Sequence, residues 1–389
     1  MAAESAKEFE ALEAQATTLL DLFKRAGYEQ VAPSILQPAD VFLDRIGEQV
    51  RSLTYMFTDL AGDELCLRPD LTVPVSRLYL ERHPRADTEA RYCYNGPAFR
   101  FQPHRPRSQR EFRQAGVECF GVADRDRADA EIVLLAAEAV RRAGLERFSL
   151  RFGDIALFYA LIDALGLPER WRLKLRHYFW RPPGFHELLA QLARGERANG
   201  DGPASALAAT LAGKTQSEAE ELVGAYLDGQ GLPLAGNRTL GEIAARLLDH
   251  AADLRAEPLP KEVATVIDYY LAVSGPPKEA AERVAMIAKG AGIDLGPALD
   301  ATIRRFDRLE DSGADLGRAV FSTEFGRDLE YYSGLVFQIE AGGGANGNQI
   351  AGGGRYDGLL EALGAPRNVP AVGAAVHTER LLAAVQGAA

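Results

Sequence analysis

Alternating hydrophobic and polar positions predict two neighbouring strands within residues 96–121, which read GPAFRFQPHRPRSQREFRQAGVECFG. Successive side chains of a strand point to opposite faces, so residues two or four positions apart share a face. Arg100 and Gln102 therefore share one face of the first strand, and Gln114 and Glu118 share one face of the second. This pattern is typical of a polar floor for a small zwitterion, but a solvent-exposed hairpin with a basic loop would show it too.

Hydrophobic spacing predicts helices and further strands around this hairpin. An amphipathic helix is expected over residues 5–26, ending near Gly27, with further helices over LTVPVSRLYLERH and DRADAEIVLLAAEAVRRAGL. Short apolar runs predict strands on both sides of the DLAGDE hairpin tip, and RFSLRFGDIALFYALIDALGL reads as a strand, a turn and a helix. Strands return from residue 317, AGGGANGN predicts a flexible hairpin tip, and HTERLLAAVQ predicts a last helix.

The pattern changes over residues 168–316, where Ala, Leu, Glu and Arg dominate with helical periodicity and Gly or Pro breaks. We interpret this region as a helical insertion. Strands on both sides of an insertion predict one antiparallel sheet built from distant segments, flanked by helices. We therefore expect an α+β core of residues 1–167 and 317–389.

Composition and charge narrow the class of protein. The net charge of −11 favours partners other than nucleic acid, because proteins that bind its backbone usually present a basic face. The N-terminus lacks the pattern of a signal peptide, and no apolar run reaches the roughly 18 residues of a membrane span, so we expect a cytoplasmic protein without membrane contact. Three widely spaced cysteines predict buried free thiols, and the scattered histidines predict no metal site.

Six stretches of the chain, in order, resemble the motifs of the histidyl-tRNA synthetase core, which has the class II aminoacyl-tRNA synthetase fold. AGYEQVAPSILQPADVF is similar to the first class II motif, which contains Pro33 and implies a dimer contact. LRPDLTVP is similar to the amino-acid-binding loop, and the hairpin of residues 96–121 to the second motif. GRDLEYYSGLVFQ and GGGRYDGLLEALG resemble two histidine-specific signatures, and VPAVGAAVHTERL resembles the third motif.

This resemblance implies a histidine pocket. It assigns the ammonium group to Asp70 and Thr72, the imidazole to Glu118 and Tyr332, and the carboxylate to Arg327. Strand periodicity allows only one of Tyr331 and Tyr332 to face the pocket, and the motif selects Tyr332. The alternative for Glu118 is a buried structural carboxylate paired with Arg327. The full set of histidine-binding candidates is Asp70, Thr72, Arg100, Gln114, Glu118, Arg327, Tyr332 and Tyr356.

The ATP subsite departs from the family at three positions. Gln102 stands where the family has a glutamate, Ser108 where it has an arginine, and His377 where it has a glycine, while Arg380 matches. Gln102 lacks a full charge, Ser108 cannot neutralise phosphate, and the His377 imidazole lies where backbone should approach the nucleotide. Because adenylation depends on positioning the phosphates, we expect aminoacylation to be lost, with no catalytic residue and no cofactor.

The chain stops nine residues after Arg380, so we expect no anticodon-binding domain and no tRNA partner. This profile resembles the regulatory subunits of ATP phosphoribosyltransferase, which are related to the synthetase. That resemblance implies a role in the first step of histidine biosynthesis, assembly with the short-form catalytic subunit, and feedback inhibition by L-histidine. The alternatives are a free-standing histidine-adenylating enzyme and an amino-acid-sensing regulator of translation.

Overall fold

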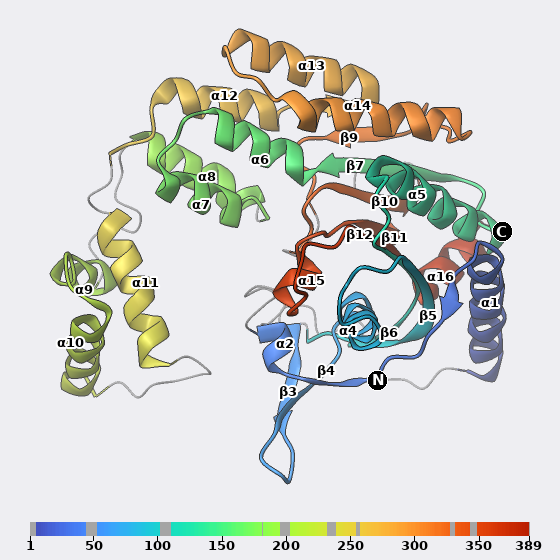
Figure 1. The fold of residues 1–389 in the computed structure, drawn as a ribbon, viewed down its shortest axis with the longest axis horizontal. Helices are drawn as coiled ribbons and strands as arrows, with labels where there is room; N and C mark the ends of the chain where they lie inside the picture. Colours follow the sequence, from blue (N-terminus) through green and yellow to red (C-terminus); the bar gives the residue numbers. More distant parts are fainter. Residues whose placement is uncertain are drawn as a thin grey trace. The chain divides into compact units, whose positions relative to one another are not determined.

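The computed structural model describes residues 5–43, 53–101, 110–180, 182–194, 203–231, 239–253, 257–326, 331–342 and 348–388. Within these ranges the chain forms two compact units (Figure 1). The first unit comprises Met1–Pro168 and Tyr269–Ala389, and the second comprises Glu169–Asp268. The predicted site lies in the first unit.

A nine-stranded mixed sheet forms the centre of the first unit. Its strands, in spatial order, are β1 (Glu29–Gln30), β5 (Ala90–Phe99), β6 (Glu111–Phe120), β12 (Ala371–His377), β11 (Asn348–Arg355), β10 (Leu335–Ala341), β7 (Phe148–Asp154), β9 (Val320–Ser322) and β8 (Ser274–Gly275). The pairings from β5 to β7 are antiparallel, which confirms the expected sheet built from distant segments. The outer pairings β1–β5 and β7–β9 are parallel, so the sheet as a whole is mixed.

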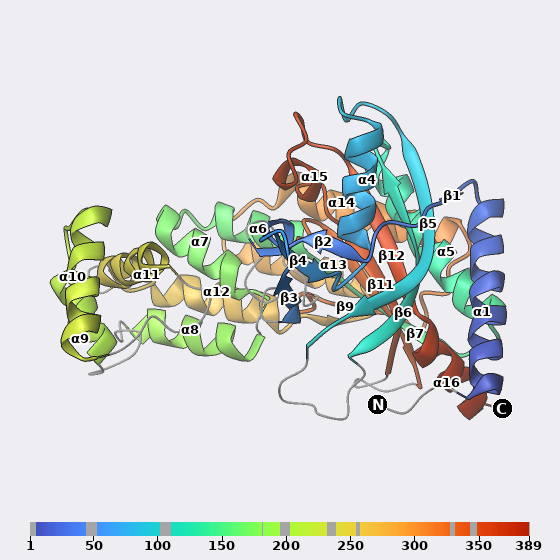
Figure 2. The ribbon, with the colours of Figure 1, turned by 90° about the horizontal axis from the view of Figure 1, so that it is seen from below.

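Helices cover the sheet, and their sequences show why they form. Helix α1 (Ala6–Arg25) begins at Ser5, whose side chain accepts a hydrogen bond from the Glu8 N–H, and buries Leu12, Leu19 and Phe23 at helical spacing. Helix α5 (Arg125–Arg142) packs on β10, β11 and β12, and α16 (Thr378–Ala388) packs on β6, β11 and α1. Figure 2 shows α1 and α4 (Thr72–Arg82) on opposite sides of β5 and β6.

Smaller elements complete the first unit. The predicted hairpin around DLAGDE is confirmed: β3 (Tyr55–Thr58) pairs with β4 (Glu64–Leu67), and β4 pairs with β2 (Leu36–Pro38). The short helices are α2 (Asp40–Leu43) and α15 (Leu359–Ala362). Helix α6 (Ile155–Ala164) follows β7 directly, because the Asp154 side chain ends the strand and accepts from the N–H groups of Ala156 and Leu157.

The first unit includes part of the expected insertion. The sequence pattern predicts one helical insertion over residues 168–316, whereas the second unit ends at Asp268 and the rest of that segment lies with the sheet. Strand β8 pairs with β9, α14 (Gly296–Asp311) packs on α5 and α6, and α13 (Pro277–Gly290) packs on α14 and β9. The buried ring of Phe306 on α14 contacts the rings of Phe152 and Phe321 in the sheet.

The second unit is helical in its described part, as predicted. Its helices are α7 (Glu169–Tyr178), α8 (Pro182–Arg194), α9 (Pro203–Thr210), α10 (Gln216–Gly229), α11 (Leu240–Asp253) and most of α12 (Lys261–Leu271). A small core forms around Leu211, Val223 and Ala244. Asp253 on α11 holds α7 through ion pairs with Arg170 and Lys174.

Candidate functional site

The site is built on one face of β6, where Gln114 and Glu118 lie four residues apart as predicted. On the adjacent strand β12, His377 lies opposite Gln114 and Gly373 lies opposite Glu118. The Glu118 carboxylate lies directly over the bare backbone of Gly373: a Cβ atom there would lie 1.6 Å from Glu118 Oε2. A glycine is therefore required beneath this carboxylate.

Three hydroxyl groups donate hydrogen bonds to the buried Glu118 carboxylate. Oε1 accepts from Thr72 Oγ1 at 2.8 Å and from the Tyr94 hydroxyl at 3.0 Å, and Oε2 accepts from the Tyr356 hydroxyl. Thr72 opens α4, Tyr94 is on β5 and Tyr356 follows β11, so four separate elements meet at one side chain. All four residues are buried.

Burial dominates the electrostatics of the two carboxylates. It raises the pKa of Glu118 to about 7, although the hydrogen bonds from Tyr356, Thr72 and Tyr94 lower it, and the nearby Asp70 carboxylate raises it further. Burial also raises the pKa of Asp70, against the hydrogen bond from the Val73 N–H and the charges of Arg100 and Arg68. The site therefore holds two interacting acids whose charges a cationic or hydrogen-bonding ligand would stabilise.

Two buried oxygens at the site have no hydrogen-bond partner within the described part of the chain. They are Oδ2 of Asp70, whose Oδ1 accepts from the Val73 N–H at 3.1 Å, and Oε1 of Gln114. A buried acceptor without a donor costs roughly 1–3 kcal/mol, so such atoms mark places where a ligand can supply N–H groups. Both oxygens belong to residues predicted to bind the amino acid.

Aromatic rings form one wall of the site. The Tyr331 ring lies 4.8 Å from Tyr332 and 5.7 Å from Tyr356, centroid to centroid. Burial raises the pKa of the Tyr331 hydroxyl, and the neighbouring Tyr332, Asp70 and Glu118 raise it further. Sequence reasoning selected Tyr332, which is buried against Tyr331 and Tyr356, and missed Tyr331 as a site residue. Both tyrosines precede β10, which begins at Leu335, so strand periodicity does not govern them.

The predicted ATP subsite is described in part. His377 packs its ring on Phe112 at 5.2 Å, and the Arg100 guanidinium lies 5.2 Å from the centroid of that ring. Arg100 also donates from Nε to the Pro69 carbonyl at 2.9 Å, beside Asp70. Arg380 Nη1 donates to the Gln349 carbonyl at 3.3 Å. Gln102, Ser108 and Arg327 lie outside the described residues.

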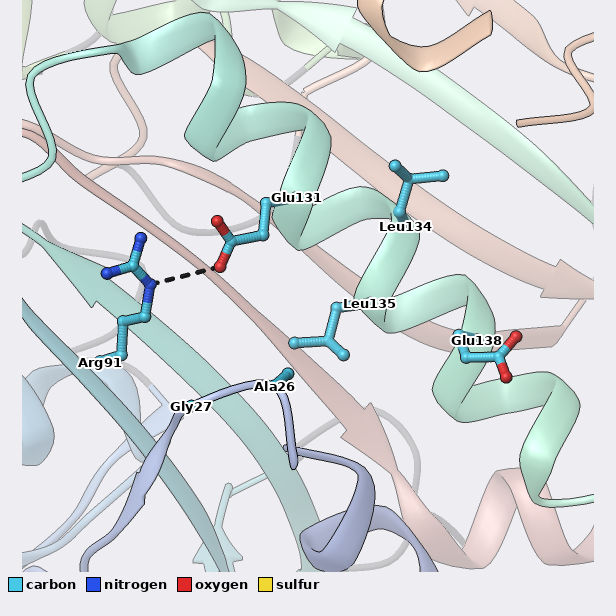
Figure 3. Close-up of a pocket in the computed structure, with 7 residues that line it drawn as sticks. All are labelled: Ala26, Gly27, Arg91, Glu131, Leu134, Leu135 and Glu138. Carbon is cyan, nitrogen blue, oxygen red and sulfur yellow. Dashed lines mark hydrogen bonds and ion pairs between the residues drawn. The ribbon is translucent and has the colours of Figure 1, made fainter. Parts of the chain in front are cut away.

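A separate hollow lies between the end of α1 and helix α5 (Figure 3). Its lining consists of Ala26, Gly27, Arg91, Glu131, Leu134, Leu135 and Glu138. Its central carboxylate, Glu131, already accepts hydrogen bonds from Arg91 at 3.3 Å and from Tyr28 at 2.8 Å. None of the predicted site residues lines this hollow, and its paired charges do not indicate a ligand.

Cys66, Cys93 and Cys119 are free and buried, as predicted. In the described ranges, no group of three or more His, Cys, Asp or Glu side chains is arranged to hold a metal ion. Among the same residues, no helix combines the length and apolar character that a membrane crossing requires.

The family described as Histidyl-tRNA synthetase matches residues 4–222 and 245–381. The ATP phosphoribosyltransferase regulatory subunit of Mesorhizobium japonicum is 36% identical over 368 residues, covering 94% of this chain and 96% of its own. The protein of the same name from Brucella anthropi is 34% identical over 354 residues, covering 91% and 92%.

A solved structure shares the fold. It is an ATP phosphoribosyltransferase regulatory subunit/histidyl-tRNA synthetase from Bacillus halodurans, which superposes with a TM-score of 0.67 at 20% identity. The superposition covers 99% of this chain and 82% of that one. The similarity supports the class II synthetase-like fold, with its mixed sheet flanked by helices.

Proposed function

Because the chain belongs to the histidyl-tRNA synthetase family, and its curated relatives are ATP phosphoribosyltransferase regulatory subunits, we propose that it is the non-catalytic regulatory subunit of an ATP phosphoribosyltransferase and binds histidine at the Glu118 site. Under this proposal its partner is the short-form catalytic subunit, and bound histidine inhibits the complex. A second copy of the chain would associate through the region of the first class II motif around Pro33.

The observation that carries the proposal is the set of buried acceptors at the site. Oδ2 of Asp70 and Oε1 of Gln114 lack donors within the described residues, and the Glu118 carboxylate lies nearby on the same strand as Gln114. Histidine supplies donors at both ends: three N–H groups on its ammonium and one or two on its imidazole. Pairing these groups would relieve the cost of the buried acceptors, which supports an amino acid with a cationic or N–H-bearing side chain.

The surroundings of Phe112 support a role without ATP activation. The ring is buried, with the His377 imidazole and the Arg100 guanidinium each 5.2 Å away. By the family resemblance, His377 stands where the family has a glycine in the floor of the adenosine site. An imidazole packed there leaves less room for a nucleotide base, in keeping with a binding subunit that performs no adenylation.

Feedback inhibition requires a coupling free energy between this site and the substrate sites of the partner. Such coupling is reciprocal and typically amounts to about 1–3 kcal/mol. Histidine bound at the Glu118 site would weaken substrate binding or turnover in the catalytic subunit. Where histidine lowers the affinity for a substrate, that substrate lowers the affinity for histidine by the same factor.

Calorimetric titration of the purified chain with histidine, and separately with ATP, tests this proposal. We expect histidine to bind and ATP not to bind, and Glu118→Gln to weaken histidine about 10- to 100-fold, because it replaces a charged acceptor. Glu361→Gln is the matched control, because Glu361 is exposed on α15. In the complex reconstituted with the short-form catalytic subunit, histidine should inhibit the native and Glu361→Gln forms and lose potency with Glu118→Gln.

The other outcomes discriminate between functions. ATP binding together with histidine-dependent pyrophosphate exchange would replace the proposal with a histidine-adenylating enzyme. If the native chain activates its partner but does not bind histidine, the sensor role is refuted while partner activation survives.

A further inference from the structure

A chain of buried charges crosses the first unit on the face of the sheet opposite the Glu118 site. Arg305 on α14 pairs with Asp129 on α5, with 2.8 Å between Nε and Oδ2. The other oxygen of Asp129 pairs with Arg355 at the end of β11, with 2.6 Å between Nη2 and Oδ1. All three side chains are buried, so Asp129 forms a bridge between two arginines from elements distant in the sequence.

One end of the chain of charges reaches the residues beside Tyr356. Arg355 donates from Nη1 to Asp357 Oδ1 at 2.8 Å, and that oxygen also accepts from the Ala371 N–H at 2.9 Å. The Asp357 N–H donates to Ser333 Oγ at 3.0 Å, and the Ser333 N–H donates to the Arg355 carbonyl at 2.8 Å. The residues on both sides of Tyr356 are thus fixed, while Tyr356 itself donates its hydroxyl hydrogen to Glu118.

The other end reaches the junction of β7 and α6. Arg305 donates from Nη1 to Asp154 Oδ2 at 2.5 Å, and Thr302 donates to the same oxygen at 2.9 Å. The second oxygen of Asp154 accepts the first N–H groups of α6. Helix α14 therefore contributes both Arg305 and Thr302 to this array of charges.

Stability alone is a weak explanation for this arrangement. The cost of removing charges from water often cancels their mutual attraction in the interior. Apolar residues of similar volume would therefore stabilise the unit at least as much as these charges do. Charged groups differ from apolar ones in direction: the Arg355 guanidinium donates hydrogen bonds to Asp129, to Asp357 and to the Arg125 carbonyl, and this arrangement accepts only one placement of its partners. The contact between Arg305 Nε and Asp129 Oδ2 is an ion pair without hydrogen-bond alignment, so it acts through charge and distance. A shift of α14 would move Arg305 away from Asp129 and so disturb Arg355 next to Tyr356.

We infer that the buried chain Arg305–Asp129–Arg355 positions Tyr356 against Glu118 and couples the histidine site to helix α14. The inference rests on the proposed function for the identity of the ligand, but the positioning of Tyr356 does not depend on it. The three residues act through Tyr356 and are positioning residues. A displacement of helix α14, caused by binding elsewhere on the first unit, would then alter the affinity of the Glu118 site for histidine.

The test is a pH titration of Glu118 in the full chain. Carbon-13 NMR of side-chain-labelled glutamate monitors the titration, and the Glu118 signal is assigned by its absence from the Glu118→Gln variant. The hydrogen bond from Tyr356 lowers the pKa of Glu118, so Tyr356→Phe should raise the midpoint and set the largest shift. Arg355→Lys and Arg305→Lys keep the charge but not the two-sided geometry. We expect both to raise the midpoint, by on the order of half a pH unit.

Arg308→Lys is the matched control, because Arg308 lies on the same helix and pairs with exposed Asp124 at 3.3 Å. It should leave the midpoint unchanged. If the Arg305 variant does not fold, Thr302→Val tests the same end of the chain of charges, because it removes one hydrogen bond to Asp154.

Histidine affinity provides the second readout. Calorimetry should show binding weakened about 3- to 10-fold in the Arg355 and Arg305 variants and unchanged in the control. A normal Glu118 midpoint in folded Arg355→Lys, with a raised one in Tyr356→Phe, would overturn the inference. Absence of histidine binding by the native chain would refute the proposed ligand and leave the Glu118 titration as a valid test of positioning.

Discussion

At the residue scale, Glu118 depends on what lies beneath and around it. Its carboxylate occupies the space that a side chain at position 373 would fill, and it takes hydrogen bonds from three hydroxyl groups on separate elements. The carboxylate therefore has one position. A ligand that binds it meets an acceptor already oriented, which reduces the ordering cost of binding.

Replacing Gly373 with alanine should remove histidine binding. The new methyl group would lie 1.6 Å from Glu118 Oε2, so the carboxylate must leave its position and lose its hydroxyl donors. We expect at least a 10-fold loss of affinity by calorimetry, together with a lower melting temperature. Gly358→Ala is the control, because no heavy atom lies within 4 Å of a Cβ there and φ is −79°. Native-like affinity in Gly373→Ala would show that Glu118 is not the imidazole acceptor.

Glu118 should also leave a signature in the pH dependence of stability. Its pKa is raised from 4.5 to about 7 in the folded chain, so between these values the folded state holds a proton that the unfolded state releases. The free energy of unfolding should therefore fall as pH rises through this window, by on the order of 3 kcal/mol from this group. Urea unfolding at several pH values should show a flatter profile for Glu118→Gln. Parallel profiles for the two proteins would contradict the raised pKa.

At the element scale, the hydrophobic pattern of the sequence predicts most helices and strands. It also predicts which site residues lie together when they belong to the same element. Alternation placed Gln114 and Glu118 on one face of β6, and spacing placed α1, α4 and α5. Tyr331 was missed because the segment before β10 is not a strand, so alternation could not report its direction. Its ring lies 5.7 Å from that of Tyr356, which follows β11, and local patterns contain no information about such contacts.

The N-terminus of helix α10 is stabilised by a local motif, a capping box, whose contribution can be tested. Thr215 and Glu218 form a capping box, in which the Thr215 side chain accepts from the Glu218 N–H and the Glu218 carboxylate accepts from the Thr215 N–H. Thr215→Ala should lower the stability of the second unit by about 1 kcal/mol.

Tryptophan fluorescence can report this loss, because both tryptophans, Trp171 and Trp180, are buried in the second unit. Ser217→Ala changes an exposed position in the same helical turn and serves as the control. An unchanged urea midpoint in Thr215→Ala would show that the box contributes nothing to this unit.

At the scale of the whole molecule, the division of the chain could be predicted only in part. The helical periodicity that marks the insertion continues unchanged into α13 and α14, which belong with the sheet. Helix α14 is held against the sheet by contacts between residues distant in the sequence. Examples are the hydrogen bond from Arg305 to Asp154, 151 residues away, and the packing of Phe306 on Phe152. The same limit applies to the site, where Tyr356 reaches Glu118 across 238 residues.

The overall charge yields a prediction about nucleic acid. A chain with net charge −11 lacks the excess of cations that holds phosphate backbones, and this disadvantage grows with salt. Filter binding at roughly physiological salt should therefore retain no tRNA. A histidyl-tRNA synthetase with its anticodon-binding domain provides the positive control. Salt-sensitive retention of tRNA by the native chain would favour the translation-regulator alternative.

The packing of Glu118 on the bare backbone of Gly373 also constrains how the sequence can diverge. Any substitution at position 373 would place a Cβ atom 1.6 Å from Glu118 Oε2 and 2.7 Å from the backbone oxygen of Val117. Loss of the acid at position 118 removes the first clash but not the second, so glycine should persist at position 373 even in descendants that have lost Glu118. A lineage that has abandoned the ligand would then be recognisable by change at position 118 alone.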